Sequence, residues 1–524
     1  MADNQITFTT PKDTTSVTIF VTNSEGLTSY YTDKKETDNI ENPFKDTEGH
    51  WAQQVISNMY RYKIVNGENT NEGLKFNPNK SMTRYEALAP AYEKHGFSGA
   101  IQTIKKEQAD LYGENTKFLY HLDLGILHHY NKDFDASIKE LTAAAQVYDD
   151  LYARSVTNEA AAIATNDNVR PYRARPFELL LLYEIQVLNF LAKGDIDGAA
   201  VEVRRGQLAM EQLYQKDNKK VNDNGFLRYL GALVYELADE SDDAAIAYYK
   251  TVKAYDESKH PLPKEVWGFV CDRLVANDRA DDLKSFEHTP LVFPKAQESR
   301  EKKQEIIVVA YGGHSPILGE LYMSGTFVNG GGLNLNYKDP QTGRTTNFTM
   351  IAPIMPNADE GLSFHIGFSL PEKKVLNSRV NGFNVRLGSK QEKLESMLDT
   401  DLELTQNLDD DRNVTVGRTA LRVALRTFAA QKAKQAMQTE NALLNLVTSI
   451  GTDVAQSQLE QADLRIGLFY PHNIYMTRLP VDAGNHNVEV SALNKNGSVV
   501  KSFNFSNIQV KSGETKFLFV PAIE

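Results

Sequence analysis

The sequence has almost no cysteine, since Cys271 is the only one among 524 residues. A single cysteine excludes an internal disulfide framework and any zinc site built on several cysteines. Glycine and proline are also sparse, with 32 and 18 residues, which excludes the collagen-like and low-complexity classes. An excess of basic residues is missing as well, because 57 Lys+Arg stand against 69 Asp+Glu. A protein built mainly to bind nucleic acid is therefore disfavoured.

Long hydrophobic runs are missing too. The most apolar stretch, residues 177–191, is interrupted by Glu178, Glu184, Gln186 and Asn189, so it predicts a packed helix rather than a membrane span. The first residues, Met-Ala-Asp-Asn-Gln, form neither a basic segment nor the apolar core of a signal peptide. We expect either a cytosolic protein or an exported one whose signal peptide has been removed, and the motifs below favour the second.

Hydrophobic residues make up 41% of the chain, enough for several cores, and the length corresponds to about three or four domains. Strand-like alternation and helical periodicity occur in separate blocks, which predicts an α+β multidomain fold. We expect the following segments: an N-terminal β segment and linker (1–42), a helical unit (43–95), helical repeats (96–262), a helical linker (263–305), a β-rich region (306–410), a long helical stretch (411–465) and a small, C-terminal β-sandwich-like domain (466–524).

Local patterns support these segments. The run Val17-Thr-Ile-Phe-Val-Thr22 alternates as a strand does, and Ile306-Ile-Val-Val-Ala-Tyr311 is typical of a buried strand. Asn496-Gly497 marks a hairpin turn near the C-terminus. An acidic loop is expected at Leu408-Asp-Asp-Asp411, followed by a helix with one apolar face and a second helical arm, together a long helical hairpin. That face is predicted from Leu421, Ala424, Leu425 and Phe428 and continues at Leu443, Val447 and Ile450.

Three segments between residues 100 and 257 look alike, each with a polar turn followed by an alanine-containing step. They are centred on His121–Ala144, Leu191–Ala200 and Tyr229–Tyr249. Small residues such as Gly125 and Gly231 allow two antiparallel helices to approach closely. The pattern resembles degenerate tetratricopeptide repeats, which implies an α-solenoid with a concave surface for a protein partner.

The sharpest local motif lies between residues 44 and 90. It reads Phe44-Lys-Asp46, Gly49-His-Trp51-Ala52, Ile64-Val-Asn-Gly67, Phe76-Asn-Pro78 and Met82-Thr-Arg84-Tyr-Glu86-Ala87. Thr83 and Glu86 have the spacing of a capping box, which predicts a helix beginning there, and a first helix is expected from Gly49. Between them, residues 66–78 are expected to form a loop.

This motif resembles the surface-layer homology (SLH) domain. The resemblance implies binding of a cell-envelope polymer, either a secondary cell-wall polysaccharide or modified peptidoglycan, with Asp46, Trp51 and Arg84 lining the glycan groove. An indole offers a flat apolar face to a sugar, and a guanidinium offers two parallel donors to a carboxylate. Such domains often occur in threes and one copy is visible here, so the domain would either bind weakly or gain avidity in a homo-oligomer. Each residue also has a structural interpretation: Trp51 in a core, Asp46 in a turn and Arg84 paired with Glu86.

A second resemblance covers roughly residues 115–524. Beside the repeats, the segments 165–168, 171–173, 176–178, 462–465 and 478–480 resemble a family of bacterial tetratricopeptide-repeat lipoproteins of no assigned activity. That resemblance implies an envelope location. The cysteine of a lipobox is missing, so a lipid anchor is not supported. The segment 165–173 is interpreted as a loop that caps helices, with ligand contact as the alternative.

The sequence contains few candidates for a catalytic or metal site. Ser315 follows a strand and a glycine turn, but Pro316 comes next and the nucleophile-elbow spacing is missing. His121 and His128 lie two helical turns apart, too far to share a metal ion. Arg418, Arg422 and Arg426 form a basic stripe, interpreted as a solvated helix face or as a contact for anionic lipid or glycan.

We therefore predict an extracytoplasmic envelope protein without enzymatic activity, cofactor or metal. It would attach to a wall polymer through its SLH domain and scaffold protein partners through its helical repeats, with no nucleic acid partner and no transmembrane segment. One alternative is a self-assembling surface or filament subunit that pairs through its N-terminal β segment. The other is an envelope hydrolase with a site near Ser315.

Overall fold

A computed structural model of the chain gives two compact units, Met1–Gly113 and Glu114–Glu524, which are described one at a time. It describes residues 16–22, 28–34, 43–44, 48, 57, 68–70, 73–75, 84–155, 170–217, 223–258, 260–277, 279, 281–282, 304–338, 343–355, 358–436 and 462–523.

The strands of the first unit form two hairpins. Strand β1 (Ser16–Thr22) pairs antiparallel with β2 (Thr28–Lys34), which confirms strand structure where residues 17–22 alternate. Strands β3 (Glu68–Thr70) and β4 (Gly73–Lys75) also pair antiparallel. This second hairpin lies inside the stretch expected to be a loop, and its three-residue strands are too short to show the alternation by which a strand is predicted.

The helical part of the first unit begins where the capping motif predicts. Helix α2 (Arg84–Lys106) starts directly after Thr83, and α3 (Gln108–Leu111) follows it. The backbone of Gly96, at φ 61° and ψ −154°, interrupts α2, and a residue without a Cβ adopts this conformation at little cost. The predicted helix from Gly49 lies outside the described residues, apart from the helical Ser57.

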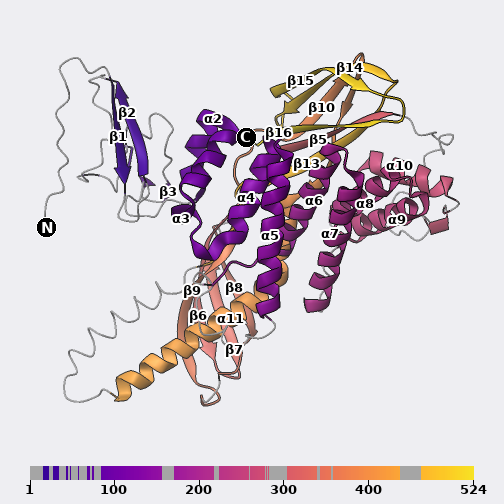
Figure 1. Cartoon of the computed structure of the whole chain (residues 1–524). Coiled ribbons are helices and arrows are strands. Elements are labelled where there is room, and N and C mark those ends of the chain that lie inside the picture. The colour runs from indigo at the N-terminus through magenta and orange to yellow at the C-terminus, as the bar shows by residue number, and fades with distance from the viewer. Residues whose placement is uncertain are drawn as a thin grey trace. The chain divides into compact units, whose positions relative to one another are not determined.

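In the second unit, a short 3₁₀ turn η2 (Glu114–Thr116) precedes a series of helices in which each contacts the next (Figure 1). They are α4 (Lys117–Tyr130), α5 (Phe134–Ser155), α6 (Pro176–Lys193), α7 (Ile196–Asp217), α8 (Gly225–Leu237), α9 (Ser241–Glu257) and α10 (Lys264–Ala276).

The three segments that look alike in sequence become three helical hairpins, α4–α5, α6–α7 and α8–α9. Each hairpin turns at one residue with a left-handed backbone: Lys132 (φ 63°), Gly194 (φ 72°) and Asp239 (φ 64°). A Cβ added at Gly125 would come within 2.5 Å of the Leu141 side chain, so the small residue permits the close approach of α4 and α5. The tetratricopeptide-like solenoid itself stays a prediction.

Two four-stranded sheets share one hydrophobic core. One has the order β12-β13-β5-β16 and the other the order β11-β10-β14-β15. The strands are β5 (Glu305–His314), β10 (Gly382–Leu387), β11 (Lys390–Lys393), β12 (Glu395–Asp399), β13 (Pro471–Pro480), β14 (Gly484–Leu493), β15 (Val499–Val510) and β16 (Thr515–Ala522). Side chains of both sheets meet in the core, including Ile306, Val308, Phe383 and Val490.

The strands of residues 466–524 therefore do not form sheets of their own. Strand β5 pairs antiparallel with β13 on one side and parallel with β16 on the other, and β10 pairs with β14. The predicted boundary between a C-terminal β-domain and residues 306–410 is therefore wrong. Alternation within a strand carries no information about distant pairing partners. The predicted buried strand is confirmed, since residues 305–313 are all buried.

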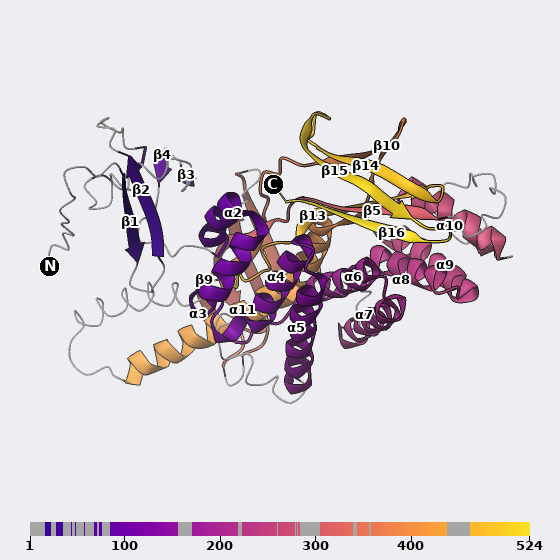
Figure 2. The ribbon, with the colours of Figure 1, turned by 45° about the horizontal axis from the view of Figure 1, so that its top comes forward.

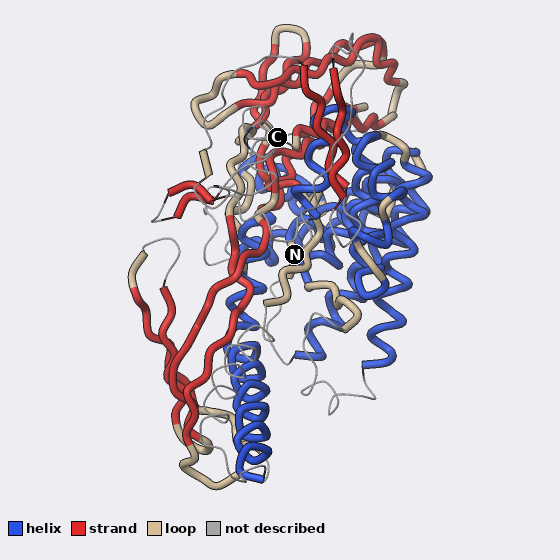
Figure 3. Tube along the Cα trace, turned by 90° about the vertical axis from the view of Figure 1, so that its left-hand side faces the viewer, coloured by secondary structure: helices blue, strands red, loops and turns tan. Residues whose placement is uncertain are grey.

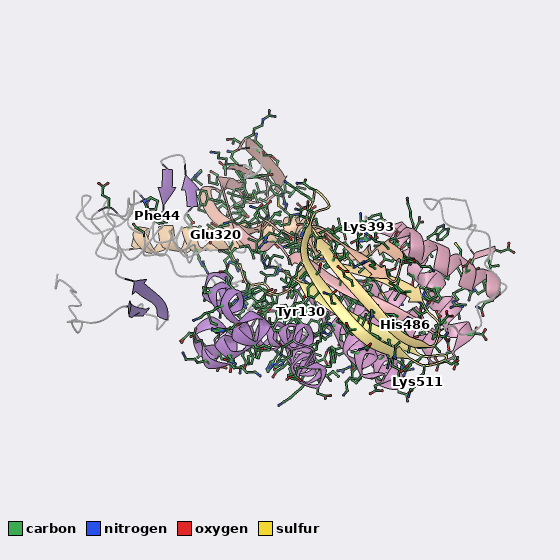
Figure 4. The ribbon with its side chains drawn as sticks, turned by 90° about the horizontal axis from the view of Figure 1, so that it is seen from above. Phe44, Tyr130, Glu320, Lys393, His486 and Lys511 are labelled. Carbon is green, nitrogen blue, oxygen red and sulfur yellow. The ribbon has the colours of Figure 1, made fainter. Side chains whose placement is uncertain are left out.

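The sheet β12-β13-β5-β16, called the first sheet below, has helices on the face that points away from the shared core (Figure 2). On this face α4 and α6 contact β16. The Tyr311 hydroxyl donates to His129 Nε2 of α4 at 2.6 Å, and His129 Nδ1 donates to Asn189 Oδ1 of α6 at 2.7 Å. Burial lowers the pKa of His129 to about 4, so the ring is neutral in this network. Tyr130, labelled in Figure 4, donates to the Phe469 carbonyl at 3.0 Å in the same region.

A third sheet, of order β8-β7-β6-β9, packs on a long helix (Figure 3). Its strands are β6 (Ile317–Val328), β7 (Gly332–Lys338), β8 (Thr345–Ile351) and β9 (Ser363–Lys374), and the helix is α11 (Thr400–Ala436). Ala424 is fully buried against the sheet and Leu421, Leu425 and Phe428 are partly buried, which confirms the predicted apolar face.

Helix α11 begins earlier than the sequence indicates. The expected acidic loop Leu408–Asp411 lies inside it, and the helix starts at Thr400 rather than at residue 411. The three aspartates are exposed, so the helix holds them without burying charge. Of the expected second arm, residues 437–461 lie outside the described part of the chain and residues 462–465 are not helical.

The fold is thus a mixture of helices and several sheets, as the α+β prediction requires. Every helix that the structure describes is too short or too polar to cross a bilayer.

Candidate functional sites

The residues of the SLH motif that the structure describes include core positions. The side chain of Phe44, marked in Figure 4, is fully buried, and Leu88 of α2 is 1% exposed. Both positions are apolar in the sequence, and both side chains are withdrawn from solvent in the first unit.

Arg84 lies at the first position of α2 and is half-buried. Its guanidinium carbon lies 4.9 Å from the centre of the Tyr112 ring, a cation–π contact. No motif in the sequence predicts this partner, which is 28 residues further along the chain. Asp46 and Trp51 lie outside the described residues, so their position relative to Arg84 stays a prediction.

A second site, missed as a unit by the sequence analysis, is a cleft of about 290 Å³ in the second unit. Residues 170–175, helix α11, strands β6 to β9 and residues 462–465 line it. We call it the arginine cleft, because seven arginines line it against three carboxylates. The arginines are Arg170, Arg173, Arg175, Arg412, Arg418, Arg422 and Arg465, and the carboxylates are Glu372, Asp411 and Asp463.

The segment before α6 is held in place by a buried carboxylate. Glu178, fully buried, accepts hydrogen bonds from the Tyr172 hydroxyl at 2.6 Å, the Tyr470 hydroxyl at 2.8 Å and the Arg175 backbone N–H at 2.8 Å. Burial and the charge of Glu178 raise the pKa of Tyr172 and Tyr470 well above 10, so both hydroxyls remain donors.

Arg465 connects the segment of residues 170–175 with the segment of residues 462–465. Its Nη1 donates to the Arg170 carbonyl at 2.8 Å, its Nε and Nη2 reach the Asp463 carboxylate at 2.8 and 2.7 Å, and its guanidinium lies 5.3 Å from the centre of the Tyr172 ring. The segments around Pro171 and Arg465, which the sequence analysis singled out separately, therefore form one structure. Residues 165–168 lie outside the described part of the chain.

Helix α11 supplies the other basic wall. Of the predicted stripe, Arg418 is exposed, Arg422 is 3% exposed and Arg426 is half-buried. The stripe is therefore not a uniform solvated face: Arg418 and Arg422 line the cleft and Arg426 does not. The apolar wall, which includes Met323, Tyr337 and Phe348 from the third sheet, had no signal in the sequence.

The remaining candidates have local partners. The Ser315 side chain is buried and its hydroxyl donates to the Pro316 carbonyl at 3.4 Å, a contact that provides no general base. His121 Nδ1 lies 2.8 Å from Glu140 and His128 Nδ1 lies 3.3 Å from Asp133. Within the described ranges, no three metal-binding side chains gather at one point.

Comparison with known families identifies one part of the chain. Residues 43–88 match the S-layer homology domain. The match covers a small part of the chain and identifies that segment alone. No curated protein matches the chain, so the lipoprotein resemblance of residues 115–524 stays a prediction. An SLH domain indicates a cell-surface or envelope protein that anchors to the cell wall.

Proposed function

We propose that the chain attaches to a cell-wall polymer through a groove lined by Asp46, Trp51 and Arg84. The match of residues 43–88 to the S-layer homology domain carries this proposal. The cation–π contact supports it, because contact with the Tyr112 ring restricts the positions that the Arg84 guanidinium can take. A guanidinium fixed in this way loses less side-chain entropy when it binds the carboxylate of an acidic sugar.

Co-sedimentation of the full chain with purified sacculi tests the groove. Trp51→Ala and Arg84→Gln are each expected to reduce the sedimenting fraction at least about tenfold, the usual loss when a charge-assisted hydrogen bond or stacking contact disappears. Far-UV circular dichroism of both variants is expected to match that of the parent. Arg204→Gln, an exposed arginine of α7, is the matched control. Sedimentation of Trp51→Ala and Arg84→Gln at the parent level would contradict the groove.

We also propose that helices α4 to α10 bind a protein partner. Val201 is 48% and Leu208 54% exposed on α7, and their seven-residue spacing places both on one helix face. Cross-linking on cells is expected to yield a discrete adduct that Val201→Glu with Leu208→Glu removes while wall attachment persists. An unchanged adduct pattern would exclude this face.

The self-assembling alternative uses β1 and β2, which form a two-stranded sheet in the structure. Such a pair has two outer edges on which a neighbouring subunit could add a strand. A chain lacking residues 1–42 would then elute later in size-exclusion chromatography than the loss of mass explains. Elution at the position of a correspondingly smaller particle of the same oligomeric state would exclude this pairing.

A further inference from the structure

The charge of the arginine cleft exceeds what its own carboxylates balance. Arg465 takes both oxygens of Asp463, and Arg412 lies 3.6 Å from Glu372. Asp411 is the third acid that lines the cleft. Arg170, Arg173, Arg175, Arg418 and Arg422 also line the cleft.

Three of the remaining arginines are placed to face a ligand. Arg173 and Arg418 are exposed and make no hydrogen bond or ion pair with the described residues. Arg175 is half-buried, and its Nε, which is buried, makes no hydrogen bond within the described part of the chain. Burial alone would lower the pKa of Arg175, but the interaction with Tyr172 and the charges of Glu178, Asp463 and Asp411 raise it, so this side chain stays cationic.

The arginines come from two directions. Residues 170–175 precede α6 and are fixed by Glu178 and Arg465, whereas Arg418 and Arg422 are four residues apart on one face of α11. Thr415 and Thr419, which also line the cleft, have the same spacing and add hydroxyl donors. Guanidinium groups converging from two sides can bind several oxygens of one group, which a tetrahedral phosphate offers and a single carboxylate does not.

One wall of the cleft includes apolar side chains. Met323, Tyr337 and Phe348 belong to the third sheet, and both aromatic rings are only partly buried. An aromatic surface beside a cationic one suits a ligand with an anionic end and a ring. The volume of about 290 Å³ is at the small end for ligand sites, which favours a single sugar-sized group.

We propose that the arginine cleft binds a phosphate ester of a sugar-sized ring, with the phosphate between Arg173, Arg175 and Arg418 and the ring against Tyr337 and Phe348. This site is independent of the SLH groove, since all of its residues lie in the second unit.

Isothermal titration of the full chain at low ionic strength tests the site with three probes: glucose 6-phosphate, inorganic phosphate and glucose. Glucose 6-phosphate is expected to bind with a dissociation constant below about 1 mM and more tightly than inorganic phosphate, and glucose is not expected to bind. Added salt is expected to weaken the binding of both anions. Equal affinity for phosphate and glucose 6-phosphate would overturn the assignment of an ester, and absence of binding by both would overturn the site.

Two exposed arginines provide variants that do not depend on core packing. Arg173→Gln and Arg418→Gln are each expected to weaken glucose 6-phosphate at least about tenfold, because each removes a charge-assisted hydrogen bond. Arg204→Gln on α7 is the matched control and is expected to leave the affinity unchanged. Equal weakening by all three variants would show that the anion binds to general surface charge, and unchanged affinity in all three would show that Arg173 and Arg418 do not bind it. Either result would overturn the proposal. Sacculus binding is expected to persist in all three, so failure of this site is distinguishable from failure of the groove.

Discussion

Arg478 of β13 connects the helices to the first sheet through two carboxylates. Its Nε and Nη2 donate to Glu305 of β5 at 2.9 and 2.5 Å, and its Nη2 also lies 3.2 Å from Glu236 of α8. Burial would raise the pKa of Glu236, but the charges of Arg478 and Arg273 hold this pKa below its usual value. Glu236 is ionised because Arg478 and Arg273 pair with it, so its charge depends on both arginines.

Arg478→Gln is expected to lower the free energy of unfolding by about 3–5 kcal/mol, because it leaves the buried Glu305 carboxylate without its cation. Arg386→Gln provides the matched control: Arg386 pairs with Glu489 on an exposed strand face and its loss is expected to cost about 0–1 kcal/mol. Chemical denaturation of both variants measures the difference. Equal costs would show that the buried pair contributes no more than a surface ion pair.

At the scale of elements, helical hairpins depend on small residues at their crossing points. Gly125→Val is expected to destabilise the chain by about 1–3 kcal/mol, because the added carbons meet Leu141 in the packed interface of α4 and α5. Ala153→Val also adds carbons to a helix, but at an exposed position of α5. It is expected to cost a few tenths of a kcal/mol. Thermal unfolding distinguishes them, and equal melting temperatures would contradict the packing argument.

Elements with a strong local period could be predicted, and their partners could not. The helix beginning after Thr83, the buried strand around Val308 and the apolar face of α11 follow from capping, hydrophobic runs and helical spacing. The pairing of β5 with β16 joins segments about 200 residues apart, which no local pattern encodes. The start of α11 was predicted too late because three consecutive aspartates favour a turn locally. In the structure they lie inside a helix of 37 residues, whose remaining residues outweigh that local preference.

The candidate sites divide in the same way. Arg84 was identified through a motif, but its contact with Tyr112 required the structure. The basic stripe of α11 and the Pro-Tyr-Arg segment were each noticed in the sequence, yet only the structure brings Arg173 and Arg418 to one cleft.

At the scale of the whole molecule, the two units have separate tasks in this account. The first unit contains the segment that matches the S-layer homology domain, and the second contains the helices, the sheets and the arginine cleft. Attachment to the wall is therefore expected to depend on the first unit, whatever the second unit binds.

The most direct measurement compares the full chain with a chain that begins at Glu114 in co-sedimentation with purified sacculi. The full chain is expected to sediment, and the shorter chain, shown to be folded by circular dichroism, is expected to stay in the supernatant. Sedimentation of both chains to the same extent would contradict attachment through the S-layer homology domain.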